Sequence, residues 1–224
     1  MRLCKKGLGG MQNPPFDPHN PVSLEELARE ASTCTRCVLS RTRTQAVFSD
    51  GSPQSPIMLI GEGPGQQEDE TGVPFVGRAG QLLTQILASV GIDRKRDIYI
   101  CNTVKCRPPQ NRKPEPEEMS ACFPYLEGQL HWVKPKIILL AGATAVQDVL
   151  KTKVGITRIR GQWFDTPFGA KAMPIFHPSY LLRNPSKEKG SPKWLMWQDI
   201  KEVRRVLDEM GVPVSGAPHE LALK

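Results

Sequence analysis

Four short apolar runs constrain the fold of this 224-residue chain more than any other feature of its sequence. They lie at 56–60, 98–101, 137–140 and 173–176. Continuous apolar runs of this length are typical of parallel strands that are buried on both faces. Because Pro174 has no N–H to donate, we expect the fourth strand to lie at an edge of the sheet or to begin near this residue.

The segments between these runs have helical features. Apolar residues recur at helix spacing over 82–90, 143–151 and 194–210. The sequence Glu-Pro-Glu-Glu at 115–118 is typical of a first helical turn, where proline and acidic residues are favoured. Ser23 and Glu26 have the spacing of a capping box. This alternation predicts a parallel sheet with helices on both faces.

A distinctive motif follows each predicted strand. Gly61 to Gly65 follow the first strand, Asn102 the second, Gly142 the third and His177 the fourth. Ligands of open α/β sheets bind beyond the carboxyl ends of the strands. We therefore expect four distant segments to meet at one edge of the sheet, and this convergence is the strongest indication of a functional site.

The glycine turn after the first strand carries an acidic side chain. Gly61, Gly63 and Gly65 would allow the backbone to approach a ligand closely. The pattern is neither a dinucleotide-binding fingerprint nor a P-loop, and a tight strand-to-helix turn is its ordinary interpretation. Glu62 favours a site, because a carboxylate in such a turn is suited to orienting a water molecule.

Each of several further side chains can be explained either by a role in a functional site or by a structural role alone. Phe75 is suited to stacking on a planar ring, although a lone aromatic is more often a core residue. Asn102 can read a ring edge, because its amide donates and accepts hydrogen bonds, or it can simply end a strand. His177 is suited to stabilising a developing anion, and Leu181 and Leu182 to wedging into a base stack. A loop histidine beside two core leucines is the alternative.

Four of the six cysteines have the spacing of a metal site. Cys34 and Cys37 form a C-x-x-C pair, and fifteen residues separate Cys106 from Cys122. A zinc ribbon would have a second C-x-x-C pair, and the spacing leaves zinc and an iron–sulfur cluster equally open. Cys101 competes with Cys106 as the third ligand. We favour Cys106, because it lies in an irregular segment whereas Cys101 lies within a predicted strand.

The charge of the chain weakly favours a polyanionic partner. Lys and Arg number 30 against 23 Asp and Glu, which gives a net charge of +7. Basic residues gather at 105–113, 158–160 and 183–193. Solvated loops are the ordinary interpretation of each cluster, but three basic loops near one sheet edge suit a phosphate backbone.

The sequence predicts one domain between two tails. We expect flexible tails at 1–20, which contains a free Cys4, and at 211–224, around a domain at 21–210. The N-terminus has no apolar leader, and the longest apolar stretch is far shorter than the roughly 20 residues that span a bilayer. We therefore expect a cytoplasmic protein, whose cysteines are metal ligands or free thiols rather than disulfides.

Taken together, these motifs resemble those of the family 4 uracil-DNA glycosylases, the iron–sulfur group of bacteria and archaea. The resemblance extends from about Cys34 to Met210 and implies a three-layer α/β/α sandwich with a central four-stranded parallel sheet. The shared segments are C-T-R-C at 34–37, G-E-G-P-G at 61–65, G-V-P-F-V-G-R-A-G at 72–80, N-T-V-K-C-R-P-P at 102–109, Cys122, and H-P-S-Y-L-L-R-N at 177–184.

The resemblance implies an activity and the roles of site residues. The activity would be hydrolysis of the N-glycosidic bond of deoxyuridine, which releases uracil and leaves an abasic site in base excision repair. Phe75 would stack on the everted uracil, Asn102 would bind its edge, His177 would stabilise the uracil anion, and Glu62 would position or activate water. Further implied residues are the substrate contacts Gly61, Gly63, Gly65 and Glu68, the DNA contacts Ser179, Leu181, Leu182 and Arg183, and the ligands of a structural [4Fe–4S] cluster, Cys34, Cys37, Cys106 and Cys122.

The implied partner is uracil-containing DNA, single or double stranded, bound by a monomer away from membranes, with a sliding-clamp partner left open. The sequence departs from the family pattern at Cys101, where threonine is usual, and at Gly63, where alanine is common. Glu62 argues against the sister iron–sulfur family, which has an apolar residue there, and the lack of a long basic insertion after Cys106 argues against the relative that traps its product covalently.

Three alternatives remain at this point. The first is a glycosylase of the same fold with a broader range that includes hypoxanthine, xanthine or thymine mismatches. The second is a non-catalytic DNA-binding module that senses redox state through the cluster. The third is a zinc-dependent hydrolase of small molecules, against which the lack of a histidine-rich metal site counts.

Overall fold

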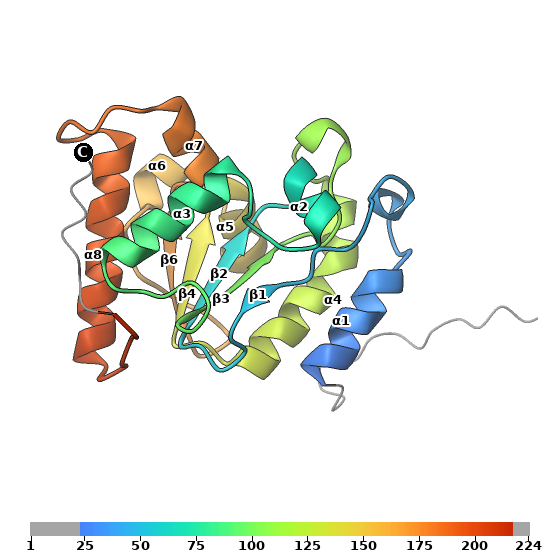
Figure 1. Cartoon of the computed structure of the whole chain (residues 1–224), viewed down its shortest axis with the longest axis horizontal. Coiled ribbons are helices and arrows are strands. Elements are labelled where there is room, and N and C mark those ends of the chain that lie inside the picture. The colour runs from blue at the N-terminus through green and yellow to red at the C-terminus, as the bar shows by residue number, and fades with distance from the viewer. Residues whose placement is uncertain (1–22, 217–224) are drawn as a thin grey trace, which may run out of the picture.

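The structure is a computed structural model that describes residues 23–216. The predicted N-terminal tail at 1–20, with Cys4, lies outside the described residues, as do residues 217–224 of the predicted C-terminal tail. The described residues form a six-stranded sheet with the order β1-β3-β2-β4-β6-β5 (Figure 1). Its strands are β1 (Asp50–Gly51), β2 (Ile57–Gly61), β3 (Ile98–Asn102), β4 (Ile137–Ala141), β5 (Phe164–Asp165) and β6 (Lys171–Ile175).

The four predicted strands form the parallel centre of the sheet, which confirms the predicted fold class. β2 pairs with β3 on one side and with β4 on the other, and β4 pairs with β6. The register places Gly61 opposite Asn102, and Ala141 opposite Ile175. The carboxyl ends of the four strands are therefore level, so the residues that follow them emerge at one edge.

Two short antiparallel strands at the edges were not predicted. β1 and β5 have two residues each, which is too short to produce an alternating pattern in the sequence. From Pro174 we expected β6 either to lie at an edge or to begin near this residue. Neither is found, because β5 lies outside β6 and β6 begins at Lys171. The proline is tolerated because β5 pairs only with Lys171 and Ala172, and Pro174 lies beyond this pairing.

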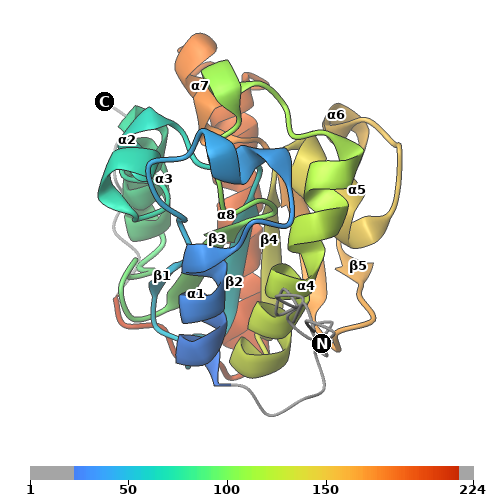
Figure 2. The ribbon, with the colours of Figure 1, turned by 90° about the vertical axis from the view of Figure 1, so that its right-hand side faces the viewer.

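Helices cover both faces of the sheet (Figures 1 and 2). They are α1 (Leu24–Thr33), α2 (Gln66–Thr71), α3 (Arg78–Ser89), α4 (Pro116–Val133), α5 (Ala143–Leu150), α6 (Ile156–Ile159), α7 (Pro178–Arg183) and α8 (Pro192–Glu209), with 3₁₀ turns at Val38–Arg41 and Pro109–Asn111. None of the helices between residues 23 and 216 combines the length and the apolar character that crossing a bilayer requires.

Alternate strand residues pack into two separate cores. Leu59 and Ile100 belong to the core that contains residues of α3, α7 and α8, whereas Met58 and Tyr99 belong to the core shared with α4 and α5. Because side chains alternate across a strand, each central strand contributes to both layers. Each fully buried aliphatic side chain stabilises the fold by about 1.5–3 kcal/mol. The three layers therefore follow from strands that are apolar on both faces.

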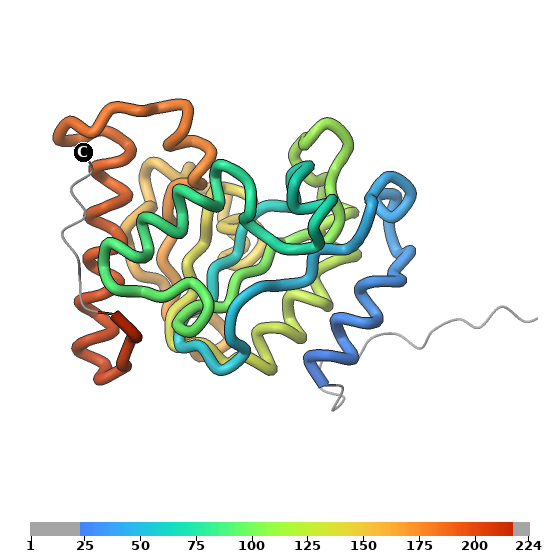
Figure 3. Tube along the Cα trace, in the orientation of Figure 1, coloured from blue at the N-terminus to red at the C-terminus, as the bar shows by residue number. Residues whose placement is uncertain are grey.

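A third cluster attaches the N-terminal segment to the flank of the domain. Leu27 and Ala31 of α1 pack with Leu39 and with Tyr125 of α4, in the same cluster as the four predicted cysteine ligands. The trace in Figure 3 follows this segment from α1 around to β1, with α4 beside it. α1 begins with the predicted capping box, in which Ser23 and the residue three positions later exchange hydrogen bonds.

The chain after α8 returns to the domain. Ser215 donates from its backbone and its hydroxyl to the carboxylate of Asp97, and Gly216 N donates to Gly91 O at 3.0 Å. These contacts lie within the segment predicted to be a tail from residue 211. The hydrogen bonds of the folded region thus continue past the predicted domain boundary at 210.

Candidate functional site

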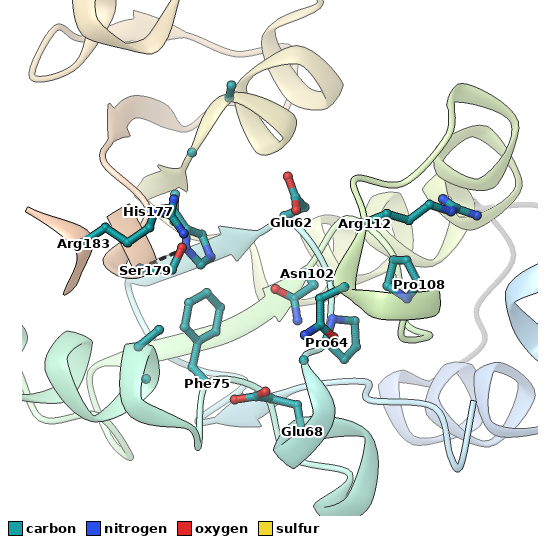
Figure 4. Close-up of a pocket in the computed structure, with 18 residues that line it drawn as sticks. Glu62, Pro64, Glu68, Phe75, Asn102, Pro108, Arg112, His177, Ser179 and Arg183 are labelled. Carbon is teal, nitrogen blue, oxygen red and sulfur yellow. Dashed lines mark hydrogen bonds between the residues drawn. The ribbon is translucent and has the colours of Figure 1, made fainter. Parts of the chain in front are cut away.

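A cavity of about 480 Å³ lies beyond the carboxyl ends of the central strands (Figure 4). It is formed by segments that follow β2, β3, β4 and β6, as the strand pattern predicted. The cavity is lined by nine of the predicted site residues, which are Glu62, Gly63, Gly65, Glu68, Phe75, Asn102, His177, Ser179 and Arg183. Distant parts of the chain therefore meet in one place.

Phe75 is held in the cavity by an unusual backbone conformation. Its φ is 54°, in the left-handed region that bulky residues rarely adopt. One carboxylate oxygen of Glu68 accepts hydrogen bonds from Val76 N at 2.9 Å and Gly77 N at 2.8 Å. A Cβ at Gly80 would lie 1.8 Å from the carbonyl oxygen of Phe75, so only glycine permits this approach of α3. Glu68 therefore lines the cavity and also fixes the loop that presents Phe75.

Asn102 lies at the bottom of the cavity, at the end of β3. Its side chain is 2% exposed, and its Oδ1 is a buried acceptor without a hydrogen-bond partner among the described residues. A Cβ at Gly61 would lie 2.4 Å from this Oδ1 and 2.6 Å from Cζ of Phe75. Gly61 does not line the cavity itself, but its missing side chain leaves room for the amide and the ring. A buried unsatisfied acceptor is costly unless a ligand supplies a donor.

Glu62 is fixed at both its backbone and its carboxylate. Its carbonyl oxygen accepts hydrogen bonds from Thr103 Oγ1 at 2.5 Å and Val104 N at 3.3 Å. Its Oε2 accepts a hydrogen bond of 2.5 Å from the hydroxyl of Thr144, in the first turn of α5. The N-terminal end of a helix favours a negative charge, so this position suits a carboxylate. The sequence did not single out Thr144, because it lies within an apolar helical pattern.

The environment of His177 selects one neutral form of its imidazole. The Nδ1 atom accepts a hydrogen bond from Ser179 N at 3.2 Å and lies 2.8 Å from the hydroxyl of the same serine. An acceptor Nδ1 leaves the proton on Nε2. Burial, helped by the positive charge of Arg183 and opposed by Glu68, lowers the pKa of His177 to about 4. His177 is therefore a neutral hydrogen-bond donor at pH 7, and its ring lies 5.7 Å from that of Phe75.

The short helix α7 divides the predicted DNA contacts into two groups. Ser179 and Arg183 line the cavity, and Arg183 is exposed. Leu181 is fully buried in the core with α3 and α8, so it cannot also serve as the predicted wedge. Leu182 is partly exposed and remains available for that role. Neighbouring helical residues point in different directions, which the sequence pattern alone did not resolve.

The wall opposite α7 was missed as part of the cavity. Pro108, Asn111 and Arg112 line it, from the segment between β3 and α4. The sequence identified this segment as a basic cluster beside Cys106 and as part of the motif at 102–109, but not as a wall of the cavity. The guanidinium of Arg112 forms two hydrogen bonds with the carboxylate of Glu118, at 2.6 and 2.8 Å, so its charge is largely balanced within the protein.

Other residues of the predicted basic clusters are also paired or buried inside the protein. Arg160 forms a close ion pair with the buried Asp199, and Lys105 is itself buried. Arg158 and Lys187, by contrast, are exposed. Because paired and buried charges are poorly placed for phosphate contacts, fewer residues are available to bind a backbone than the basic clusters suggested.

The four predicted cysteine ligands line one small hollow between α1 and α4. No group of His, Cys, Asp or Glu between residues 23 and 216 is arranged to hold a single metal ion. A single ion would need its ligands about 2.3 Å from one point, whereas a cluster spreads four cysteines over several irons. Arg43 donates to Cys106 Sγ at 3.0 Å, and Lys105 N donates to Cys122 Sγ at 3.3 Å.

Burial raises the pKa of Cys106, and raises that of Cys122 to about 12. These thiols would thus need the positive charge of bound metal to ionise. The rival Cys101 lies within β3 in the core with α4 and α5, away from the hollow. Four cysteines around one hollow, with donors aimed at two sulfurs, are a donor set that fits an iron–sulfur cluster.

Comparisons with known proteins identify the family of the chain. Residues 48–201 match the family model described as the Uracil DNA glycosylase superfamily. The chain is 44% identical over 189 residues to a type-4 uracil-DNA glycosylase of Thermotoga maritima, an alignment that covers 84% of this chain and 96% of that relative. Relatives with the same name from Sulfurisphaera tokodaii and Archaeoglobus fulgidus are 39% and 40% identical, over 82% and 73% of this chain and 84% and 85% of their own lengths.

Proposed function

The chain belongs to the type-4 uracil-DNA glycosylases, and we propose that its cavity binds a uracil everted from DNA and releases it by hydrolysis of the N-glycosidic bond. The observation that carries this proposal is the unpartnered Oδ1 of Asn102, which is buried at the bottom of the cavity between Phe75 and the glycine turn. A planar ring with an N–H group at its edge would satisfy this acceptor.

The amide of Asn102 distinguishes uracil from cytosine. Its Oδ1 accepts from the N3–H of uracil, and its NH₂ group donates to the neighbouring carbonyl. Cytosine has an unprotonated N3 at this position and would leave Oδ1 unsatisfied. The ring of Phe75 stacks on the base, a contact worth about 1–3 kcal/mol. A site of this kind rejects the wrong base because the buried amide would be left without a hydrogen-bond partner when that base binds.

His177 and Glu62 act on the two sides of the bond that breaks. As the base departs, negative charge develops on uracil and positive charge on the sugar. The neutral imidazole of His177 donates from Nε2–H to the base carbonyl that gains charge. A fixed donor of this kind raises the rate by a factor of about 10²–10³. The carboxylate of Glu62, fixed by Thr144, orients the attacking water and stabilises the cationic sugar.

Elements around the cavity mouth would hold the distorted DNA. Chemistry on a base requires that the nucleotide leave the stack, which requires a few kcal/mol. The partly exposed Leu182 fills the space that the base leaves, and Ser179 and Arg183 contact the backbone beside it. A uracil opposite guanine, or in a single strand, is easier to evert than one paired with adenine.

The four cysteines of the hollow hold a [4Fe–4S] cluster in this proposal. The ligands are Cys34 at the end of α1, Cys37, Cys106 and Cys122 of α4. When bound, the cluster cross-links the N-terminal segment to the segment that follows β3. The cluster supplies structure rather than a step of the hydrolysis, and its presence is measured by the iron and sulfide content and the visible absorption of the purified protein.

A uracil-release assay tests the function. A labelled oligonucleotide that carries one uracil is incubated with the protein and then treated with alkali, which cleaves the strand at an abasic site. We expect cleavage of single-stranded, U·A and U·G substrates, and none of matched strands with cytosine or thymine. Intact uracil strands would refute the activity, and cleavage of a hypoxanthine substrate at a similar rate would indicate the broader glycosylase.

Two variants test the reading of the base within the same assay. Asn102→Ala should abolish most of the excision, because it removes both amide contacts to uracil. Asn184→Ala removes an amide that donates to Tyr180 O at the end of α7, and it serves as the matched control. Equal rates for Asn102→Ala and the wild type would remove Asn102 from base recognition.

A further inference from the structure

Lys105 is a buried cation between the cavity and the cysteine hollow. It is 1% exposed and lies directly before Cys106. Its ammonium donates to the carbonyl oxygen of Asn102 at 2.5 Å and to Oε1 of Gln129 at 2.7 Å. Its backbone N–H donates to Cys122 Sγ at 3.3 Å. One residue is thus bonded both to the strand end that reads the base and to a cysteine of the hollow.

The ammonium of Lys105 has neutral partners only. It forms no ion pair with any carboxylate between residues 23 and 216, since both of its acceptors are uncharged. Asp148 lies within electrostatic range, but its carboxylate pairs with Lys151 at 3.4 Å. A buried charge without a counter-charge is unfavourable, so the surroundings of Lys105 call for a negative group. Lys105 lines the cysteine hollow, and the sulfurs there supply negative charge because they become thiolates when they bind iron.

The turn that contains Lys105 also contacts the other side of the cavity. Only residues 103–105 separate Asn102 from Cys106. Thr103 and Val104 both donate to the carbonyl oxygen of Glu62, and Lys105 O accepts from Val47 N at 2.7 Å. This short turn therefore has little freedom to change at one end without a change at the other.

We propose that Lys105 is a positioning residue that couples the cysteine site to base recognition. Its ammonium balances the negative charge of the thiolates and donates to the backbone carbonyl of Asn102. It thereby fixes the position of the side-chain amide that binds uracil. The inference rests on the proposed function, in which the cysteines hold a cluster and Asn102 reads the base. It assigns a role to a lysine to which the sequence analysis gave no individual role, although it lies in a basic cluster and in the motif at 102–109.

The test compares holoprotein variants at Lys105 with a control in the same segment. Lys105→Met removes the charge and keeps the length of the side chain, whereas Lys105→Arg keeps a charge and donors. Lys113→Met removes the same charge from an exposed lysine that bonds to Gln147, and is the matched control. For each protein we would measure iron content, the midpoint potential of the cluster and the single-turnover rate of uracil release.

We expect two linked changes in Lys105→Met. The midpoint potential of the cluster should become more negative, because loss of a nearby positive charge disfavours addition of an electron. Uracil release should slow by about 10- to 100-fold, as for other residues that orient a site from behind. Lys105→Arg should return the potential toward the wild-type value, and Lys113→Met should match the wild type in both measurements. A wild-type value for either measurement in Lys105→Met would overturn the proposal.

A measurement on the wild type covers the case in which Lys105→Met fails to fold. Hydrogen exchange of the peptide that spans 102–106 is compared before and after removal of iron, with strand β4 as the internal reference. We expect faster exchange in 102–106 and no change in β4, and equal exchange at 102–106 would overturn the coupling. Failure of the proposed function is distinguishable, since a wild type that releases no uracil refutes the activity while the potential of each variant can still be measured.

Discussion

The hydrogen bond between Thr144 and Glu62 provides the sharpest test of how the site works. Thr144 is 2% exposed, and its hydroxyl donates to Glu62 Oε2 at 2.5 Å. Thr144→Val removes this donor and keeps the branched shape of the side chain. The carboxylate can then leave the position from which we propose that it orients water, although its charge and its backbone contacts are retained.

The size of the effect follows from the strength of this bond. A hydrogen bond to a charged group contributes about 1.5–3 kcal/mol. Since about 1.4 kcal/mol corresponds to a factor of ten in rate, Thr144→Val should slow the chemical step about 10- to 100-fold. Thr144→Ser keeps the hydroxyl and should retain most of the wild-type rate. Glu62→Gln, which removes the charge itself, should be slower than Thr144→Val.

The assay is single-turnover release of uracil with protein in excess over a labelled U·G duplex, so that product release does not limit the rate. Thr166→Val is the matched control, because the Thr166 hydroxyl donates to Ala170 O at 2.7 Å in the turn between β5 and β6. Thermal unfolding of each variant separates a loss of stability from a loss of rate. A wild-type rate for Thr144→Val beside a slow Glu62→Gln would refute the role of Thr144, and a fast Glu62→Gln would remove the carboxylate from the mechanism.

Three further predictions concern the base pocket and its pH dependence. Because the pKa of His177 is lowered to about 4, the single-turnover rate should keep its plateau as the pH falls from about 8 to 5, and an inflection near the ordinary histidine pKa of about 6.5 would contradict the neutral donor. Because this pKa is lowered, His177 contributes stability that is fully present above about pH 6.5 and is lost as the pH falls toward 4. Thermal unfolding of the wild type and of His177→Gln across this range would measure the loss. Gly61→Ala should abolish uracil binding, because its Cβ would lie 2.4 Å from Asn102 Oδ1; the uracil inhibition constant measures this, and Gly155→Ala, where a Cβ meets nothing within 4 Å, is the control.

The sequence predicted the parallel centre of the sheet and the meeting of its loops, because both follow from local patterns. Apolar runs on strands buried on both faces are visible without any knowledge of distant contacts. Once parallel strands are assigned, their carboxyl ends must share an edge, so Glu62, Asn102 and His177 were expected to converge. The two-residue strands β1 and β5 have no such pattern and depend on the sheet that they flank.

The remaining features depend on tertiary contacts that no local pattern records. Leu181 and Leu182 are equivalent as apolar neighbours, and only the packing of α7 on the core decides that Leu181 is buried. Lysine is a residue type that is usually exposed, yet the fold buries Lys105. Thr144 contacts a residue 82 positions away in the chain. In each case the position of a neighbouring element, rather than the residue type, determines the role.

Glu68 and Phe75 show how the fold prepares the cavity before DNA arrives. The left-handed conformation of Phe75 costs about 1–3 kcal/mol. The two hydrogen bonds that Glu68 accepts from Val76 and Gly77 contribute about 1.5–3 kcal/mol each, which is enough to hold the strained loop in place. Because the ring is fixed in advance, binding of the base does not have to order it, and more of the stacking energy remains to offset the eversion of the nucleotide. Glu68 thus fixes the loop that presents Phe75 in addition to lining the cavity, so its expected contact with the substrate would be joined by a second role behind the ring.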